Sequence, residues 1–554
     1  MGIQERWIGG AGTGKTRLIE AKLTQAREEL GLDTDEVGLC TFTRAGRQEL
    51  SERVAASWGV DVEALTKHGW FRTAHSIAFR QSGVEEGALI EGKDGAEWTG
   101  HAIGARISIS QGRGGDVEYE ATDGDRDAAI SLQAWELARQ TLRPLAGVIE
   151  DQRKLGDESV TLSTARAFVE KYERAKAREG RLDFTDVVSR FAGVKNTIEG
   201  PVETDPIGEV PERLRVLAID EAQDSSAVVD RICRRLAASP SMERVFLVGD
   251  IFQCIFGFGG SDYRNFTSWD AHEEIMPQSY RCPANVMALG ERCLRQMKRG
   301  YRDRKIKPAP HRGTIREAST AEEAVGRIDP SRSTLILARC AFSLAEYEAS
   351  LKERKIPFSW IDKVHGESTL SGYKALWDLE HGQIVSGEDW SHAIAMIAVA
   401  SKSLGKLLHH GEKTAWKQGK RSNVDFVLPT PEIMSIAGCT ETLSHLILAG
   451  KWPSALEDKH AAKAADWRAA AVAHGVDVAS NPRVRLSTIH SAKGCEADDV
   501  ILSTISSRAV ENARLALDER HDEECRVNYV AVTRTRENLI VVGDGRQHRL
   551  EIPI

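Results

Sequence analysis

Gly9-Gly10-Ala11-Gly12-Thr13-Gly14-Lys15-Thr16 has the spacing G-x-x-x-x-G-K-[ST], in which each fixed position has a chemical reason. Glycines allow successive backbone N–H groups to curl around phosphate oxygens, the lysine reaches the β- and γ-phosphates, and the hydroxyl binds Mg²⁺. Apolar residues precede this loop, and a helical stretch follows it with one apolar face, made of Ile19, Leu23, Ala26 and Leu30. This order predicts an α/β nucleotide-binding sheet rather than an ordinary glycine-rich turn.

The composition is that of a soluble globular protein. The chain has 554 residues, of which 41% are hydrophobic and 28% are charged, enough for about two to four domains. No apolar run approaches the roughly 18 residues that span a bilayer, and no signal-peptide pattern is found, so a cytoplasmic location is expected. The nine cysteines are scattered without a C-x-x-C pair, which indicates neither a disulfide framework nor a zinc site.

The net charge of −8 argues against a protein that coats nucleic acid through bulk positive charge, although a local basic groove remains compatible with it. Two basic runs occur, at 295–312 and at 401–424, the second with Trp416 among its basic positions. Each is consistent with a solvated surface and with a nucleic-acid groove.

Two stretches place hydroxyl, aromatic and basic side chains where a predicted strand ends. They are 37–44, which ends in Thr41-Phe42-Thr43-Arg44, and 71–76, which contains Thr73 and His75. The carboxyl ends of strands face the ligand in an open α/β sheet. Taken by itself, each stretch favours a core or turn role over a ligand-binding one.

The buried run Val216–Ile219 delivers two adjacent carboxylates, Asp220 and Glu221, at its carboxyl end. In P-loop ATPases such a pair holds Mg²⁺ and polarises the attacking water, so Asp220 is expected at the metal and Glu221 beside the water. The next strand, 245–248, leads to Gln253, a candidate γ-phosphate sensor, and to Phe256 and Phe258. These two rings would stack on unpaired bases or belong to the core, and the flanking glycines argue against a strand interior.

The remaining segments form a second α/β pattern. Tyr280 and Arg281 open it, strand-like runs at 335–338, 484–489 and 539–542 continue it, and no second phosphate loop occurs in it. Mainly helical stretches at 84–180 and 381–480 interrupt the two patterns and indicate insertions.

Taken together, these segments resemble superfamily 1 helicases of the UvrD/Rep/PcrA type along nearly the whole chain. Eight segments resemble the family's motifs I, Ia, Ib, II, III, IV, V and VI in order: GGAGTGKT, CTFTRAGRQEL, FRTAHSIA, LAIDEAQDSS, VFLVGDIFQCIFGF, QSYRCPANV, VRLSTIHSAKGCEADDV and VNYVAVTRTRENL. The phrases RLDFTDVV and RKIPFSWID also resemble family segments.

The resemblance implies an α/β fold of two RecA-like P-loop NTPase domains, with parallel sheets flanked by helices and a mainly helical insertion in each. The expected divisions are domain 1A in two parts (1–83 and 181–277), insertion 1B (84–180), domain 2A in two parts (278–380 and 481–554) and a reduced insertion 2B (381–480). ATP would bind in the cleft between 1A and 2A.

Functional residues carry over position by position. Lys15, Thr16, Asp220 and Glu221 would hold the phosphates, Mg²⁺ and water. Gln253 and Arg281 would contact the γ-phosphate, and Arg534 would be the arginine finger. Glu496 would bind the ribose, while Arg17 and Tyr280 would sandwich the adenine. The expected single-strand groove contains Phe42, Thr43, Thr73, His75, Phe256, Phe258 and His490.

The expected activity is that of an ATP-dependent DNA helicase with ATP and Mg²⁺ as cofactors. Because Lys15 and Arg534 are far apart in sequence, closure of two domains is expected to complete the site and to ratchet the protein along single-stranded DNA. A 3′→5′ direction rests on the resemblance of the IFQCIFGF segment alone. The partners would be single-stranded DNA, single-strand/duplex junctions and replication or repair proteins, with no membrane.

The sequence departs from the family pattern at several places. Phe258 replaces the usual tryptophan, Gly259 stands where arginine is general, and the second insertion is short. No upstream glutamine motif is expected before Gly9, which leaves the preference for ATP open, and no nuclease domain is expected after Arg534.

Three alternatives remain beside the helicase. One is a DNA-dependent translocase that strips proteins without processive unwinding. A P-loop kinase or GTPase is disfavoured because no N-K-x-D motif occurs. A nucleic-acid scaffold with a vestigial ATPase is disfavoured because the catalytic residues are all present.

Overall fold

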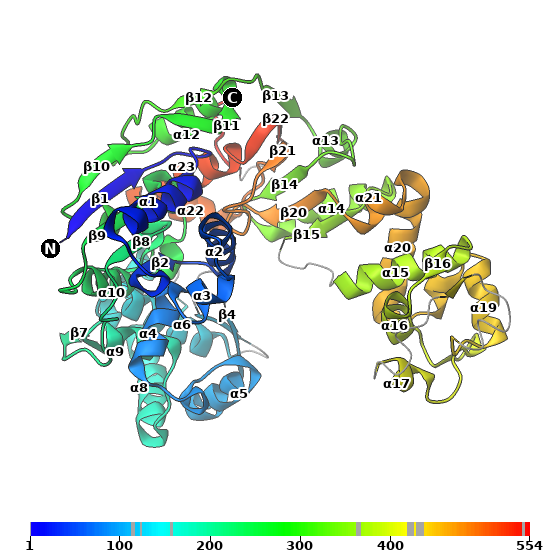
Figure 1. Ribbon diagram of the computed structural model, residues 1–554, viewed down its shortest axis with the longest axis horizontal. Coiled ribbons are helices and arrows are strands. Elements are labelled where there is room, and N and C mark those ends of the chain that lie inside the picture. The colour runs from blue at the N-terminus through cyan, green and yellow to red at the C-terminus, as the bar shows by residue number, and fades with distance from the viewer. Residues whose placement is uncertain are drawn as a thin grey trace. The chain divides into compact units, whose positions relative to one another are not determined.

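The computed structural model describes residues 2–111, 117–121, 125–155, 159–361, 367–417, 426–427, 437–543, 545 and 549–554. The chain forms two compact units (Figure 1). The first contains Met1–Gly313, Ser507–Arg534 and Leu550–Ile554, and the second contains Thr314–Ser506 and Thr535–Arg549.

The first unit is built on a six-stranded parallel sheet in the order β10-β1-β9-β8-β2-β3. Its strands are β1 (Ile3–Ile8), β2 (Val37–Thr41), β3 (Trp70–Thr73), β8 (Val216–Ile219), β9 (Arg244–Gly249) and β10 (His272–Ile275). Strands β2 and β8 are buried throughout, which explains why they read as continuous apolar runs.

Helices connect these strands and cover the sheet. They are α1 (Lys15–Leu30), α2 (Arg44–Trp58), α3 (Val62–Thr66), α4 (Ala74–Ser82), α10 (Ala227–Ala237) and α11 (Tyr263–Thr267). The apolar face predicted for 15–30 is the buried face of α1, where Ile19, Leu23 and Ala26 pack against the strands. The order of strand, loop and helix thus places the carboxyl ends of β1, β2, β3, β8 and β9 at one edge.

Between β3 and β8 the chain is mainly helical. The elements are α5 (Gly92–Ile103), a hairpin of β4 (Ile107–Gln111) and β5 (Val117–Ala121), α6 (Arg126–Gln140), α7 (Leu145–Lys154), α8 (Leu162–Glu179), α9 (Phe184–Phe191) and a hairpin of β6 (Val194–Thr197) and β7 (Gly200–Glu203). Trp135 and Tyr172 are buried in a core shared by α5 to α8. This part therefore has its own hydrophobic centre.

Three later helices also belong to the first unit. They are α12 (Ala284–Arg295), which follows β11 (Gln278–Pro283), and α22 (Arg508–Ala516) with α23 (Asp518–Val532). Strand β11 pairs with β12 (Lys307–Ala309), outside the six-stranded sheet. The division into two units does not test the finer domain boundaries expected from the sequence, which remain a prediction.

The second unit contains another six-stranded parallel sheet, in the order β13-β22-β21-β14-β20-β15. Its strands are β13 (Thr314–Ala318), β14 (Thr334–Ala338), β15 (Phe358–Trp360), β20 (Val484–Thr488), β21 (Ala497–Ser503) and β22 (Thr535–Val542), with α13 (Ala321–Val325) and α14 (Ala345–Glu353) against them. Two parallel sheets flanked by helices confirm the predicted fold class of two RecA-like domains.

A helical region lies between β15 and β20 in sequence. Its elements are α15 (Glu367–Glu380), α16 (Gly387–Met396), α17 (Glu412–Lys417), α19 (Glu441–Leu448), α20 (Asp458–His474), α21 (Val476–Ser480) and the short strands β16 (Ile384–Val385), β17 (Ala400–Ser401), β18 (Gly405–Lys406) and β19 (Phe426–Val427). Trp390, Trp416 and Trp452 are buried in its core. Trp416 is therefore a core residue, and part of the basic run 401–424 lies outside the described residues.

Two further sequence features concern the cysteines and the apolar segments. None of the nine cysteines, all of which lie in the described ranges, forms a disulfide, and seven of them are buried. In the described ranges, no helix has the length and apolarity needed to cross a membrane.

Candidate functional site

The phosphate loop joins β1 to α1, and its conformation is fixed by its backbone torsion angles and hydrogen bonds. Gly12 and Gly14 have φ values of 68° and 83°, a left-handed conformation that favours glycine, and Gly14 is the N-cap of α1. The N–H of Gly9 donates to the carbonyl of Gly249 at the end of β9, at 2.9 Å. The loop therefore stands at the N-terminus of a helix, where backbone N–H groups and the helix dipole favour an anion.

Strand β11 passes directly along this loop. The N–H of Tyr280 donates to the carbonyl of Gly12 at 2.8 Å, and the hydroxyl of Ser279 donates to the carbonyl of Ala11 at 2.8 Å. A Cβ on Gly12 would lie 2.2 Å from the Cβ of Arg281. Glycine is thus required at position 12 both by its φ and because Arg281 occupies the space beside it.

Asp220 and Glu221 follow β8 at the same edge of the sheet. Burial, together with the charge of Glu221, raises the pKa of Asp220 from 3.8 to about 7, against an opposing effect of Lys15. Glu221 has a φ of 49°, an uncommon conformation for a residue with a side chain. Asp220 is buried and Glu221 is partly buried. The two carboxylates provide the oxygen ligands that Mg²⁺ prefers and would be stabilised by a cation.

A chain of hydrogen bonds leads from this acid pair to Arg534. The amide nitrogen of Gln223 donates to Glu221 at 2.6 Å, and its amide oxygen accepts from the N–H of Asp250 at 2.9 Å. The Asp250 carboxylate accepts from Gln253 at 2.8 Å, and Gln253 accepts from Arg534 at 3.4 Å. Predicted residues from motifs II, III and VI are therefore brought together within the first unit.

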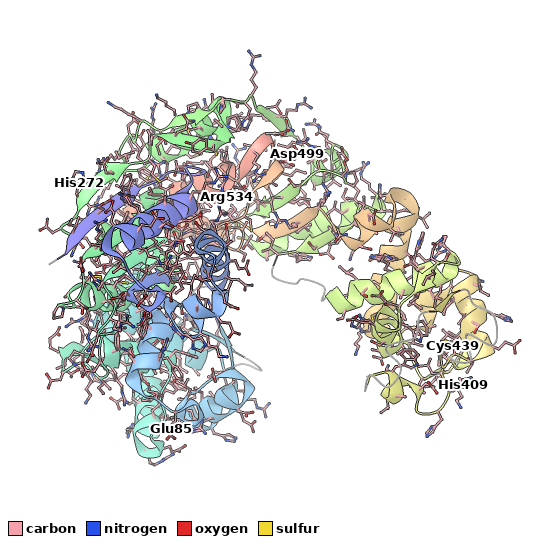
Figure 2. The ribbon with its side chains drawn as sticks, in the orientation of Figure 1. Glu85, His272, His409, Cys439, Asp499 and Arg534 are labelled. Carbon is pink, nitrogen blue, oxygen red and sulfur yellow. The ribbon has the colours of Figure 1, made fainter. Side chains whose placement is uncertain are left out.

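Two arginines predicted for the phosphate site lie close together. Arg281 donates to the carbonyl of Thr533 at 3.4 Å, one residue before Arg534. Arg534, labelled in Figure 2, is only 1% exposed, and burial followed by the charge of Arg281 lowers its pKa to about 10. Two neighbouring cations, of which Arg534 is buried and Arg281 partly buried, favour an anionic ligand.

The structure adds a buried network that the sequence analysis missed. Arg304 forms an ion pair with Asp250, donates to Glu291 at 3.2 Å and donates to the hydroxyl of Tyr529 at 3.1 Å. The same Tyr529 oxygen accepts from the N–H of Ala11 in the phosphate loop, at 3.1 Å. Tyr529 lies inside the segment that resembles motif VI. Its place in that motif was the feature of the sequence that could have identified it.

Arg304 belongs to the basic run 295–312, for which a solvated surface and a nucleic-acid groove were both considered. It is buried, and other cations of the run form ion pairs: Lys298 and Arg299 with Asp518, and Arg302 with Glu273. Much of this run therefore binds carboxylates within the first unit.

The other predicted residues of the first unit lie at or near the same sheet edge. Thr16 lies in the first turn of α1, and Arg17 and Tyr280, the proposed adenine contacts, are both exposed. Thr43 and Thr73 are the N-caps of α2 and α4, accepting from the N–H groups of Gly46 and Ser76.

Two more of these residues are partly buried. Phe42 follows β2, and His75 lies in the first turn of α4. Burial lowers the pKa of His75 against the opposing charge of Glu136.

Phe256 and Phe258 lie on the loop after β9. Their ring centroids are 6.0 Å apart in an edge-to-face arrangement, and Phe258 is 46% exposed while Phe256 is partly buried. Glu523 of α23 holds this loop by accepting from the N–H of Gly257 at 2.9 Å. Phe258 therefore presents an accessible aromatic surface and is not a core residue.

His490 and Glu496 belong to the second unit, after β20. His490 is partly buried, and Glu496 forms an ion pair with Arg536 while its carbonyl accepts from Arg485 at 3.2 Å. These two predicted residues are thus grouped separately from the phosphate loop.

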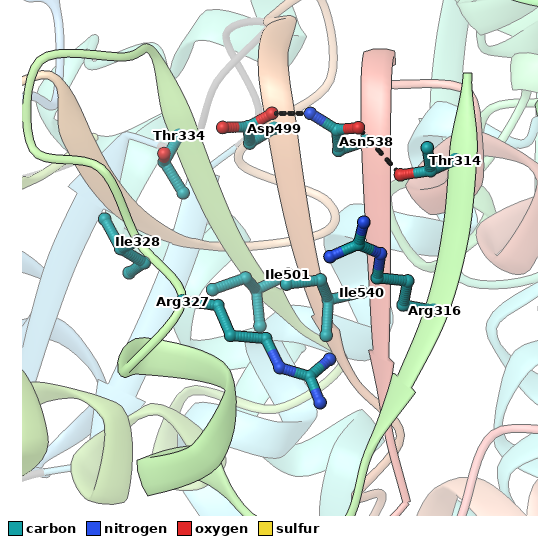
Figure 3. A pocket seen from close by; sticks show the side chains of 9 residues that line it. All are labelled: Thr314, Arg316, Arg327, Ile328, Thr334, Asp499, Ile501, Asn538 and Ile540. Carbon is teal, nitrogen blue, oxygen red and sulfur yellow. Dashed lines mark hydrogen bonds between the residues drawn. The ribbon is translucent and has the colours of Figure 1, made fainter. Parts of the chain in front are cut away.

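A small pocket of about 150 Å³ also lies in the second unit, over the sheet (Figure 3). Ile501 and Ile540 contribute to its floor, and the side chains of Arg316 and Arg327 extend over them. None of the residues predicted for ATP or DNA lines this pocket.

Family comparisons agree with this geometry. Residues 7–273 match the UvrD/REP helicase N-terminal domain, and residues 470–543 match the UvrD-like helicase C-terminal domain. The chain belongs to the UvrD-type superfamily 1 helicases. The matched ranges include the phosphate loop, the acid pair, Gln253 and Arg534.

Curated relatives share modest identity with the chain. A putative ATP-dependent DNA helicase, YjcD of Bacillus subtilis (strain 168), is 27% identical over 46% of this chain and 31% of its own length. The ATP-dependent DNA helicase PcrA of Leuconostoc citreum is 22% identical over 50% of this chain and 35% of its own length. The chain thus spans about a third of the length of these relatives.

A match of wider coverage is the ATP-dependent DNA helicase UvrD2 of Mycobacterium bovis (strain ATCC BAA-935 / AF2122/97). It is 24% identical, and the match covers 96% of this chain and 75% of that protein. The similarity therefore extends through both sheets and both helical regions.

Proposed function

We propose that this protein is an ATP-dependent DNA helicase that translocates on single-stranded DNA. The observation that carries the proposal is the gathering of a phosphate loop, two adjacent carboxylates and two arginines. Within this group, Gln223 and Gln253 connect Glu221 to Arg534 by way of Asp250. A site of this composition neutralises a phosphate chain at one end and supplies carboxylates for metal and water at the other.

Lys15, Thr16 and the loop N–H groups would bind the phosphates, and Thr16 with Asp220 would hold Mg²⁺. The raised pKa of Asp220 supports this fit, because a bound cation stabilises the ionised carboxylate. When bound, Mg²⁺ supplies charge neutralisation to the β- and γ-phosphates. Glu221 would orient and polarise the attacking water, and Gln223 holds its carboxylate for that role.

Arg281, Arg534 and Gln253 would surround the γ-phosphate. Charge that develops on the transferring phosphoryl group is stabilised by arginine, a contribution of about 10³–10⁵ in rate where such residues have been examined. Arg17, Tyr280 and Glu496 would contact the adenosine. The closing of two RecA-like domains during turnover is part of the proposal and rests on the family resemblance.

Single-stranded DNA would pass Phe42, Thr43, Thr73, His75, Phe256, Phe258 and His490. The exposed ring of Phe258 and the hydroxyl-capped ends of α2 and α4 support base stacking and backbone contact at this edge. We propose 3′→5′ movement because the IFQCIFGF segment resembles the UvrD/Rep form of motif III. Junctions of single strand and duplex, and proteins of replication or repair, are the proposed partners.

A second candidate is a DNA-dependent translocase that removes bound proteins without processive unwinding. The short second insertion favours it, since the boundaries expected from the sequence, 381–480, give that insertion about 100 residues. The helicase and the translocase both require the same ATP site and the same contacts with single-stranded DNA.

Strand displacement separates the two candidates. ATP turnover is measured with and without single-stranded DNA, alongside unwinding of 3′-tailed and 5′-tailed duplexes and release of a protein block from a single strand. The helicase proposal expects DNA-stimulated turnover and unwinding of the 3′-tailed substrate. Turnover with protein release and no strand separation supports the translocase, and preferential unwinding from a 5′ tail refutes the direction.

A further inference from the structure

The pocket of the second unit is built on a row of side chains that crosses four neighbouring strands (Figure 3). The row consists of Thr314, Asn538, Asp499 and Thr334, which are in register across β13, β22, β21 and β14. Thr314 and Thr334 begin their strands, so the row lies near the amino ends of the sheet. His490 follows the carboxyl end of β20, and the pocket is therefore separate from the residues of this unit proposed for ATP and DNA.

The floor of the pocket is an apolar part of the sheet. Helices usually cover both faces of a parallel sheet, because its strands are apolar on both sides. Helices α13 and α14 pack on this face, in a core that contains Ile501. Helix α13 has only five residues, and Ile328 and Ile540 at the edge of that core stay partly exposed. Within the described ranges this part of the face is open, and it favours an apolar group of a ligand.

Most polar groups of the row already have partners. The hydroxyl of Thr314 donates to Asn538 at 2.7 Å, and Asn538 donates to Asp499 at 2.6 Å. Arg332 donates to both carboxylate oxygens of Asp499, at 2.9 and 3.1 Å. Thr334 is different, because it is only 1% exposed and its hydroxyl has no hydrogen-bond partner in the described part of the chain. A buried hydroxyl without a partner is destabilising, so Thr334 indicates a polar ligand atom inside the pocket.

Two guanidinium groups extend over the apolar floor (Figure 3). Arg327 forms an ion pair with Glu323 and donates to the carbonyl of Glu317 at 3.1 Å. Arg316, on β13, forms no ion pair or side-chain hydrogen bond with any described residue. Guanidinium binds a carboxylate through paired N–H donors, so Arg316 provides a position for a ligand anion.

A structural role explains only part of this arrangement. Strand β13 is an edge of its sheet, and a charged side chain on an edge strand discourages pairing with another chain. That role accounts for an exposed arginine at position 316. It explains neither the unpaired hydroxyl of Thr334 nor the open apolar floor between the two residues.

We propose that this pocket binds an apolar carboxylate, with Arg316 holding the carboxylate and Thr334 donating to a second oxygen of the ligand. Three strand spacings, about 14 Å, separate β13 from β14, so the two side chains begin at opposite sides of the floor. A pocket of about 150 Å³ accommodates a body about the size of one aromatic ring. An apolar amino acid with a free carboxylate and an acylated nitrogen has all three parts.

Two sources carry this chemistry, a free N-acyl amino acid and the C-terminal residue of a polypeptide. The probes are N-acetylphenylalanine and an acetylated peptide of four glycines and a final phenylalanine, each as the free acid and as the amide. Saturation-transfer NMR measures their affinities for the full chain as wild type, Arg316→Ala and Thr334→Val. Arg549→Ala is the matched control, because Arg549 is an exposed arginine of the same unit that does not line the pocket.

We expect the free acids to bind about tenfold or more tightly than the amides, since an amide offers no charge to Arg316. Arg316→Ala should weaken binding of the acids about tenfold, and Thr334→Val about 2- to 10-fold. Arg549→Ala should bind like the wild type. Tighter binding of the peptide acid identifies a polypeptide terminus as the source, and equal affinities identify the free amino acid.

Undetectable binding of both acids to the wild type would overturn the inference, and so would full binding by Arg316→Ala. Thermal unfolding without ligand checks the second contact. Thr334→Val should melt no lower than the wild type, because the lost hydroxyl has no partner among the described residues. A lower melting temperature would show that this hydroxyl is already hydrogen-bonded and would remove it from the site. The proposed function is tested separately, since ATP turnover by the wild type does not depend on any of these outcomes.

Discussion

The backbone N–H of Ala11 in the phosphate loop donates to the phenolic oxygen of Tyr529 at 3.1 Å, across 518 positions of sequence. Tyr529 lies on α23, and Arg534 follows shortly after that helix ends. The hydrogen bond therefore ties the loop proposed to hold the phosphates to the helix that precedes the proposed arginine finger. Arg304 and Asp250 surround the same oxygen, so the connection is buried and charged.

Tyr529→Phe should destabilise the protein in the absence of nucleotide. The change leaves the N–H of Ala11 and one N–H of Arg304 without their acceptor, and a buried unpaired donor costs about 1–3 kcal/mol. Urea unfolding measures the free energy. Tyr373→Phe is the control, because within the described ranges the Tyr373 hydroxyl makes a single long hydrogen bond, to His460 O at 3.4 Å. An equal loss of unfolding free energy in both variants would show that the hydrogen bond to Ala11 does not stabilise the protein.

Lys15→Ala should abolish ATP turnover by removing charge neutralisation at the phosphates, while Glu221→Gln should preserve ATP binding and block hydrolysis. Turnover is followed by phosphate release, and binding by a fluorescent ATP analogue. Lys22→Ala tests the loss of a lysine from the same helix, where Lys22 pairs with Glu5 at 2.7 Å, and should retain activity. Wild-type turnover in either site variant would remove the assignment of the site.

Arg534→Ala should lower kcat far more than it weakens nucleotide binding, because an arginine finger acts mainly in the transition state. Steady-state kinetics with saturating single-stranded DNA give kcat and KM separately. Arg508→Ala removes an exposed arginine from α22 and is expected to leave both parameters unchanged. An effect limited to KM would identify Arg534 as a ground-state ligand.

Asp220 should make the stability of the nucleotide-free protein depend on pH. Its pKa is about 7 in the folded protein and near 3.8 when unfolded, so the folded state binds more protons between these values. The free energy of unfolding contributed by this carboxyl therefore falls as the pH rises from about 4 to 7. Thermal unfolding should show the wild type losing stability relative to Asp220→Asn across that window. A constant difference between the two proteins would mean that the pKa of Asp220 is not raised.

Phe258→Ala should weaken single-strand binding by about 1–3 kcal/mol, the range measured for base stacking on aromatic side chains. The ring is 46% exposed, so its removal should cost little stability. Phe342→Ala is the matched control, since Phe342 is an exposed phenylalanine that no motif assigns to DNA. Fluorescence anisotropy measures the affinity of both variants for oligo-dT. Equal affinities would show that Phe258 does not bind DNA.

The phosphate loop and the acid pair could be predicted from the sequence because their chemistry is local. Spacing within a few residues identifies Lys15, Thr16, Asp220 and Glu221, and apolar runs identify the strands that carry them. The alternation of strands and helices indicated an α/β fold, and the family resemblance implied two RecA-like domains. The two parallel sheets confirm this fold class.

Arg304 shows where sequence reasoning stopped. Its neighbours in sequence are basic, and Lys298, Arg299 and Arg302 form partly exposed ion pairs. Composition alone therefore indicated a solvated face or a groove. Burial against Asp250 depends on β11, α12 and α23 packing beside the phosphate loop. The spacing of a basic run does not indicate which of its cations is buried, so Arg304 could not be identified from the sequence.

The sequence by itself determined the chemistry of the site, because each motif brings its reactive groups together within one strand end or one loop. Only the tertiary structure decided which motifs meet. It joined Glu221 to Arg534 through Gln223, Asp250 and Gln253, and it joined Ala11 to Tyr529. Such pairings arise because buried polar groups must find partners wherever the packed chain supplies them, however distant in sequence those partners are.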